Sequence, residues 1–105
     1  MTVSPQLRTP SRFASRRESE QFRTALMEAA DMRRSQLEDL PRAEGDPMLR
    51  AQRDALEQVL KEITSALGRL EEGQFGRCSA CAEPIPVERL EVRPWSSRCV
   101  RCARR

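Results

Sequence analysis

The sequence has no histidine and no tyrosine among its 105 residues, and only one tryptophan. Without an imidazole the chain cannot form a Ser-His-Asp triad or a two-histidine metalloprotease site, and it lacks the commonest general base. These absences exclude most enzyme mechanisms, and we expect a protein that is not an enzyme.

Long hydrophobic runs are also missing. No segment approaches the roughly 18 apolar residues that span a bilayer, and residues 1–17 lack the apolar stretch of a secretory signal. We therefore expect a cytoplasmic protein with no membrane partner. Hydrophobic residues make up 38% of the chain and charged residues 33%, with a mean hydropathy of -0.68. One large hydrophobic core is not expected from this composition.

The N-terminal half predicts a tail followed by a helix. Residues 1–14 contain two prolines and no apolar periodicity, which is typical of a flexible tail. Ser15 and Glu18 have the spacing of a capping box, so a helix is predicted from about 16 to 40, ending at Pro41. Its apolar positions are mostly three and four residues apart, with Arg33 as an interruption: Phe22, Leu26, Ala29, Leu37 and Leu40.

A second helix is predicted over residues 46–72. Asp46 is an N-cap residue followed by a proline, and Gly73 provides a C-terminal signal. Seven positions within it repeat in strict four- and three-residue steps, and six are apolar: Leu49, Arg53, Leu56, Leu60, Ile63, Leu67 and Leu70. This pattern predicts a coiled-coil seam. We expect residues 15–72 to form a monomeric antiparallel helical hairpin with its tip at about 41–46.

The four cysteines form two C-x2-C pairs separated by seventeen residues: Cys78, Cys81, Cys99 and Cys102. This spacing is typical of a tetrahedral four-thiolate zinc site, and structural disulfides are not expected in the cytoplasm. Four sulfur ligands leave no open position, so we expect one structural zinc ion and no catalytic metal. A thiol–disulfide pair or a metal-releasing redox sensor is the alternative, although a thioredoxin-type motif needs a βαβ unit that this chain lacks.

Residues 73–105 are predicted to be a small zinc-finger module. Apolar residues and prolines are mixed between the cysteine pairs, which predicts the short irregular strands of a zinc ribbon. Phe75 and Trp95 are expected to pack around this ribbon or against the base of the hairpin. The predicted fold class is mainly α: an antiparallel two-helix coiled-coil hairpin with a small C-terminal four-cysteine zinc ribbon.

Charge is unevenly distributed along a chain of net charge +3. The hairpin tip is expected to be acidic, because four carboxylates face only Arg42 there: Glu38, Asp39, Glu44 and Asp46. The C-terminal end is basic, with Arg98, Arg101, Arg104 and Arg105. Such runs usually form a solvated face, but they also favour an alternative function, a zinc-ribbon interaction or nucleic-acid-binding module that contacts phosphates.

The second half of the chain resembles the DksA/TraR family over about residues 46–102. The resemblance is carried by ALGRLEEGQFGRCSAC at 66–81, Pro84-Ile85, residues 88–91, Arg93-Pro94 and the second cysteine pair. It implies a zinc protein that binds RNA polymerase and regulates transcription initiation without sequence-specific DNA binding. It also implies that the coiled coil enters the polymerase secondary channel and brings its tip near the catalytic magnesium.

The family carries a D-x-x-D-x-A motif at this tip. Asp46 and Ala51 match the first acid and the alanine, and Leu49 stands in place of the second acid. The resemblance implies that these three residues form the partner-binding tip, with Asp46 near the active-site metal and Ala51 packing closely. Ala82 stands where the family usually has glycine, so a left-handed backbone there would cost about 1 kcal/mol.

Overall fold

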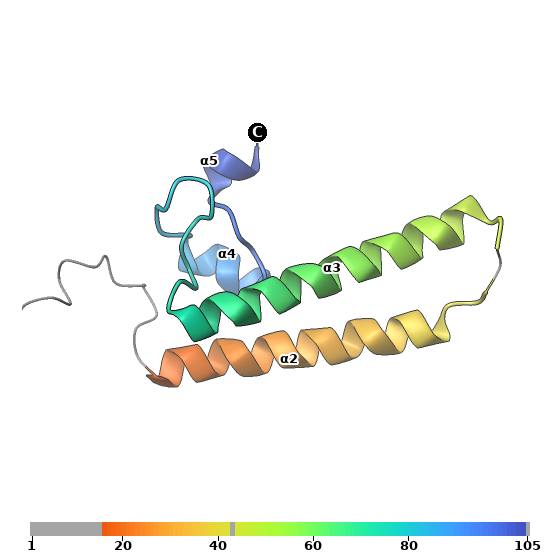
Figure 1. The fold of residues 1–105 in the computed structure, drawn as a ribbon, viewed down its shortest axis with the longest axis horizontal. Coiled ribbons are helices and arrows are strands. Elements are labelled where there is room, and N and C mark those ends of the chain that lie inside the picture. The colour runs from red at the N-terminus through yellow and green to blue at the C-terminus, as the bar shows by residue number, and fades with distance from the viewer. Residues whose placement is uncertain (1–15, 43, 105) are drawn as a thin grey trace, which may run out of the picture.

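The computed structural model describes residues 16–42 and 44–104, with four helices. These are α2 (Arg16–Asp39), α3 (Pro47–Glu72), α4 (Val87–Val92) and α5 (Val100–Ala103). The predicted tail at 1–14 and the capping hydroxyl of Ser15 lie outside the described residues. Helices α2 and α3 form a long antiparallel hairpin, and the C-terminal module, residues 73–104, lies on α3 at the end opposite the tip (Figure 1).

The predicted ends of α3 are confirmed by its caps. The Asp46 carboxylate oxygen Oδ1 accepts hydrogen bonds from the backbone N–H groups of Met48, at 2.9 Å, and Leu49, at 3.3 Å. Gly73 has the left-handed φ of 75° that ends the helix, and its N–H donates to the carbonyl of Leu70. These local signals act within one turn of the chain, which is why the sequence located both ends correctly.

The buried core lies entirely at the base of the hairpin. Helix α2, helix α3 and the C-terminal module all contribute to it: Leu26, Ala30, Ile63, Ala66, Phe75, Ile85, Leu90 and Trp95. The rings of Phe22 and Phe75 meet with centroids 5.1 Å apart. Phe75 and Trp95 therefore pack against the hairpin base as expected, and the hairpin and the module share one core.

The distal half of the hairpin has no core of its own. Among the described residues from 31 to 62, none is buried, and the seam positions Leu49, Arg53, Leu56 and Leu60 are only half-buried. The predicted seam lies between α2 and α3, but two helices alone cannot enclose it. The distal half is therefore a slender arm that extends from a packed base.

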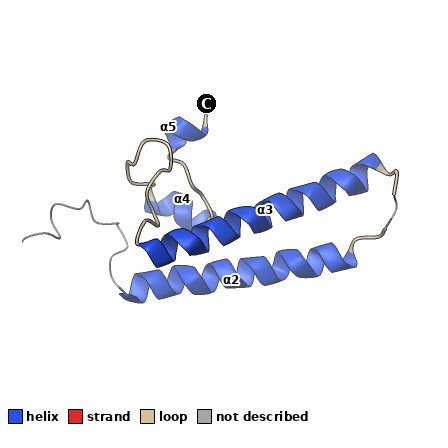
Figure 2. Cartoon of the chain, viewed as in Figure 1, coloured by secondary structure: helices blue, strands red, loops and turns tan. Residues whose placement is uncertain are grey.

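The predicted strands between the cysteine pairs are wrong. The described part of the module contains no strand, only an isolated antiparallel bridge between Arg77 and Pro84, and residues 87–92 form helix α4 (Figure 2). Leu90 is fully buried whereas Val92 is 82% exposed, so the apolar residues do not alternate as in a half-buried strand. Pro94 then disfavours a helical conformation at Arg93, where α4 ends.

The position of the core leads to a prediction about stability. Ile63 is 1% exposed, so Ile63→Ala should lower the free energy of unfolding by about 2–5 kcal/mol. Leu56→Ala removes a similar side chain from the half-buried distal seam and should cost clearly less. Urea denaturation of the zinc-loaded protein measures both variants. Equal losses would contradict a core confined to the base.

Candidate metal centre and hairpin tip

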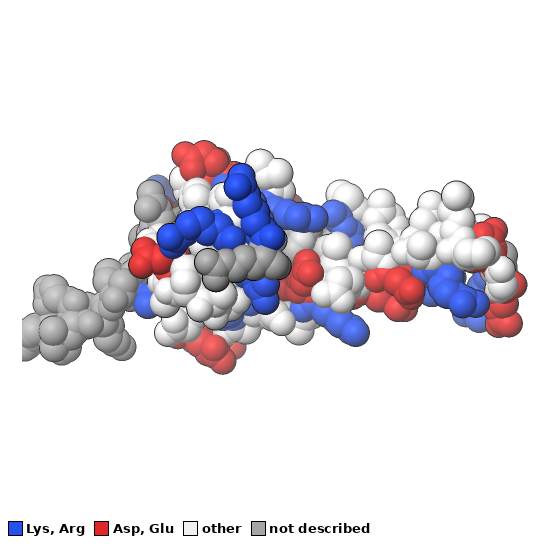
Figure 3. Space-filling view, turned by 90° about the horizontal axis from the view of Figure 1, so that it is seen from above, with Lys and Arg blue, Asp and Glu red and all other residues white. Residues whose placement is uncertain are grey.

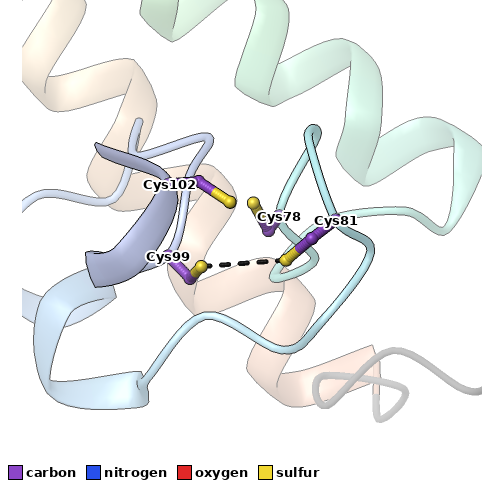
Figure 4. Close-up of side chains that lie close together, drawn as sticks. All are labelled: Cys78, Cys81, Cys99 and Cys102. Carbon is purple, nitrogen blue, oxygen red and sulfur yellow. Dashed lines mark hydrogen bonds between the residues drawn. The ribbon is translucent and has the colours of Figure 1, made fainter. Parts of the chain in front are cut away.

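The four cysteine side chains converge on one point within the C-terminal module (Figure 4). Their Sγ atoms all lie within 4.8 Å of one another, and those of Cys81 and Cys99 are 3.8 Å apart. Three of the cysteines are buried and Cys81 is exposed. The structure therefore brings together the four residues that the C-x2-C spacing predicted.

Backbone hydrogen bonds fix the turns that carry these cysteines. The N–H of Cys78 donates to the carbonyl of Glu83, at 2.8 Å, and the N–H of Ala82 donates to that of Cys78, at 2.9 Å. The N–H of Ser79 donates to the carbonyl of Ser97, at 2.8 Å, and joins the two cysteine segments. Ala82 has a φ of 68°, so the predicted left-handed strain is present.

The thiols of the cluster differ in their tendency to ionise. Burial raises the pKa of the Cys78 thiol, but hydrogen bonds from backbone groups of Cys99, Ala80 and Cys81 outweigh it and lower the pKa to about 6. Hydrogen bonding with the other three thiols, together with burial, raises the pKa of Cys102 to about 12. The surroundings of the cluster therefore favour the thiolate at Cys78 and disfavour it at Cys102, where a bound cation would displace the proton.

The donor set fits zinc. A regular tetrahedron with metal–sulfur distances of about 2.3 Å has sulfur–sulfur edges of about 3.8 Å, which is the distance between Cys81 and Cys99. Four soft thiolates select zinc over harder cations, and they leave no ligand position for water or substrate. The chemistry of the site is thus that of a structural ion, which would join the two cysteine segments.

Arginines of the hairpin hold the module in place. The Arg33 guanidinium lies 5.1 Å from the centroid of the Trp95 ring, within the range of a cation–π contact. Arg69 donates to the carbonyl of Ser96, at 3.5 Å, and burial lowers its pKa. The sequence analysis did not predict this role of Arg33. Its position as a single charge within an apolar stripe was a signal that a polar or aromatic side chain packs against it.

The structure places the three predicted tip residues on the first turns of α3. Asp46 and Ala51 are exposed and Leu49 is half-buried. Leu49 lines a hollow of about 520 Å³ together with Arg42, Arg50, Arg53 and other residues of the loop. The tip is therefore of mixed charge and not simply acidic as predicted, because Arg50 and Arg53 of α3 lie near Arg42. Figure 3 shows side chains of both signs at this end of the molecule.

The C-terminal arginines have different surroundings. Arg98, Arg101 and Arg104 are exposed, and Arg105 lies outside the described residues. A hydrogen bond with Cys99 and attraction to the cysteine cluster raise the pKa of Arg101. The positive charge of Arg101 therefore interacts favourably with the thiolates of the cysteine cluster.

Comparison with known proteins agrees with this geometry. Residues 73–105 match the family model of the prokaryotic dksA/traR C4-type zinc finger. The RNA polymerase-binding transcription factor DksA of Escherichia coli K12 is 30% identical over 98 residues, covering 83% of this chain and 65% of that protein. Residues 73–105 of this chain are a zinc finger of the DksA/TraR family. Its four-cysteine cluster is accordingly a structural zinc site.

Other relatives extend the comparison. The DksA of Haemophilus influenzae is 38% identical over 50 residues, which are 48% of this chain and 34% of that protein. The chain spans less than two thirds of the length of these curated relatives. The structure of transcription factor DksA2 from Pseudomonas aeruginosa shares the fold, with a TM-score of 0.68 and 23% identity over 95% of this chain and 92% of that chain. None of the described helices has both the length and the hydropathy to cross a membrane.

Zinc removal should separate the module from the hairpin. Because residues 73–104 have little secondary structure of their own, chelation should unfold them while leaving part of α2 and α3 helical. Circular dichroism should show partial helix loss, and the fluorescence of the single tryptophan, Trp95, should shift to longer wavelength as the ring is exposed. Unchanged signals after verified metal removal would contradict the stapling role of zinc.

Proton release tests binding of zinc by four thiolates. Because the module is expected to unfold without zinc, its four thiols are then free thiols, which are mostly protonated at neutral pH. Binding of zinc by all four should therefore release close to four protons, and zinc affinity should fall as the pH is lowered. Calorimetry in buffers of different ionisation enthalpy gives the number, and release of two protons or fewer at neutral pH would contradict the prediction.

Proposed function

We propose that this protein binds RNA polymerase and regulates transcription initiation, with the hairpin tip entering the secondary channel and reaching the active site. The observation that carries the proposal is the slender distal arm fixed at its base to a zinc module. At 1.5 Å per residue, the 24 and 26 residues of α2 and α3 span about 36 Å and 39 Å. Relatives named RNA polymerase-binding transcription factor DksA support the choice of partner.

The same arrangement supports a protein that acts by binding and is not an enzyme. Four cysteine ligands would leave a zinc ion no open position for water or a substrate. The proposed partner, RNA polymerase, implies that the protein acts in the cytoplasm. Sequence-specific DNA binding is not expected, because α2 and α3 pack on each other and α4 and α5 are shorter than two turns. One hairpin fits one channel, so we propose that the protein acts as a monomer.

Asp46 is the residue proposed to act near the polymerase metal. Both cap hydrogen bonds use its Oδ1 atom, so Oδ2 takes no part in the cap. A single carboxylate can therefore start α3 and still present a charged oxygen to the partner. Ala51 is exposed on the next turn, where a small side chain allows a channel wall to approach closely.

The C-terminal arginines support the nucleic-acid alternative less well. Arg101 interacts with the cysteine cluster. Among the described residues, this leaves Arg98 and Arg104 as the exposed C-terminal arginines that could contact phosphates. A phosphate binder of this kind loses affinity steeply with salt and needs no hairpin tip. Binding to purified polymerase that persists at physiological salt and requires residues 41–51 would favour the proposal over the alternative.

The tip carboxylate gives a sharp test in a reconstituted initiation assay. Asparagine caps helices about as well as aspartate, so Asp46→Asn should keep α3 intact and change stability by a few tenths of a kcal/mol. The variant should still bind polymerase but lose its effect on initiation. Asp54→Asn is the matched control, since it makes the same change at an exposed position of α3 outside the cap. Full activity of Asp46→Asn would argue against an active-site role for the tip.

Leu49→Asp is the reciprocal variant. It restores the second acid of the family motif at the start of α3, where a carboxylate interacts favourably with the helix N-terminus. The effect on initiation should become stronger than that of the unmodified protein in the same assay, at equal occupancy of polymerase. No change in transcription from either variant would show that the acidic motif has no function here.

A further inference from the structure

Three arginines surround the hollow at the hairpin tip. Arg42 comes from the loop, and Arg50 and Arg53 come from the first two turns of α3. Its volume of about 520 Å³ lies within the range of pockets that take small organic ligands. Leu49, Pro41 and Glu44 complete most of the lining. The hollow is thus large enough for a ligand with several charged groups.

The arginines of this hollow are available for an external anion. In the described part of the chain, the ion pairs join Arg23 with Glu71 and Arg34 with Asp31, and neither includes a residue of the hollow. Arg53 is held across the hollow by a hydrogen bond from its Nη2 to the carbonyl of Pro41, at 3.4 Å. Three arginines against one glutamate leave the lining with a net charge of +2.

Among the described residues, the neighbouring carboxylate forms no ion pair with these arginines. Asp46 is engaged through Oδ1 with the N–H groups of Met48 and Leu49, and it is not among the residues that line the hollow. Leu49 and Pro41 supply an apolar side instead of further acids. The electrostatics of the hollow itself are therefore opposite to those predicted for the tip as a whole.

We propose that this hollow binds an oligophosphate, such as the triphosphate group of a nucleoside triphosphate. Guanidinium groups are planar donors that bind phosphate oxygens in pairs, and several of them around one space match a chain of phosphates better than a single phosphate. The binding does not require polymerase, so it stands or falls independently of the proposed function. The tip would then carry an anion-binding site in addition to the Asp46 carboxylate.

The experiment is calorimetric titration of the full-length zinc-loaded protein with inorganic triphosphate and, separately, with ATP, at low and physiological salt. We expect one saturable site for both ligands, with affinity that falls as salt rises. In the double variant Arg42→Gln/Arg50→Gln, affinity should fall at least about tenfold. Arg53 is left unchanged because it also holds Pro41. The control Arg98→Gln/Arg104→Gln removes the same charge from the module and should change affinity less than about twofold.

The two ligands separate the possible sources of the phosphate. If triphosphate and ATP bind with equal affinity, the site recognises the phosphate chain alone. If ATP binds more tightly, and the Arg42→Gln/Arg50→Gln variant loses this difference, the site recognises a nucleotide. Equal losses in the tip and module variants would overturn the proposal, because they would show attraction to net charge. Absence of saturable binding at low salt, or binding of ATP with which triphosphate does not compete, would overturn it as well.

Discussion

Coordination of zinc by four thiolates is the interaction on which the rest of the structure depends. Helices α4 and α5 have six and four residues, which is too short for either to be stable alone. Joining the two cysteine segments brings Phe75, Ile85, Leu90 and Trp95 to one side of the module, where they close the core of the hairpin base. A chain with few apolar residues thereby obtains one well-packed region instead of a weak core spread over its length.

The concentration of packing at one end has a mechanical consequence. The base fixes the direction of the hairpin through the shared core, the contact of Arg33 with Trp95 and the hydrogen bond from Arg69 to Ser96. The distal arm keeps a half-buried seam and exposes its remaining side chains. A slender arm of two helices, oriented by a base that contains the zinc module, suits the insertion into a channel that we propose.

Much of this organisation was predictable from the sequence, because the signals involved are local. Asp46 begins α3 and Gly73 ends it through contacts with residues two to four positions away, and the cysteine spacing restricts the metal. Helix α4 was missed because six residues among prolines show too little periodicity to separate a helix from a strand. The position of Arg33 over Trp95 was not predictable because it depends on packing between segments distant in sequence. The position of Arg42 beside Arg50 and Arg53 depends on the conformation of the loop before α3, which the sequence pattern did not specify.

The central claim is that the zinc module orients the hairpin so that its tip, and no other part, reaches the polymerase active site. Replacing the catalytic magnesium of the polymerase with iron, and generating hydroxyl radicals at that ion, cuts whatever backbone lies close to it. The account predicts cleavage of the bound protein within residues 41–51 and none within 73–104, and loss of this cleavage after zinc is removed. Cleavage within the module, or an uncut tip in a protein that remains bound, would contradict it.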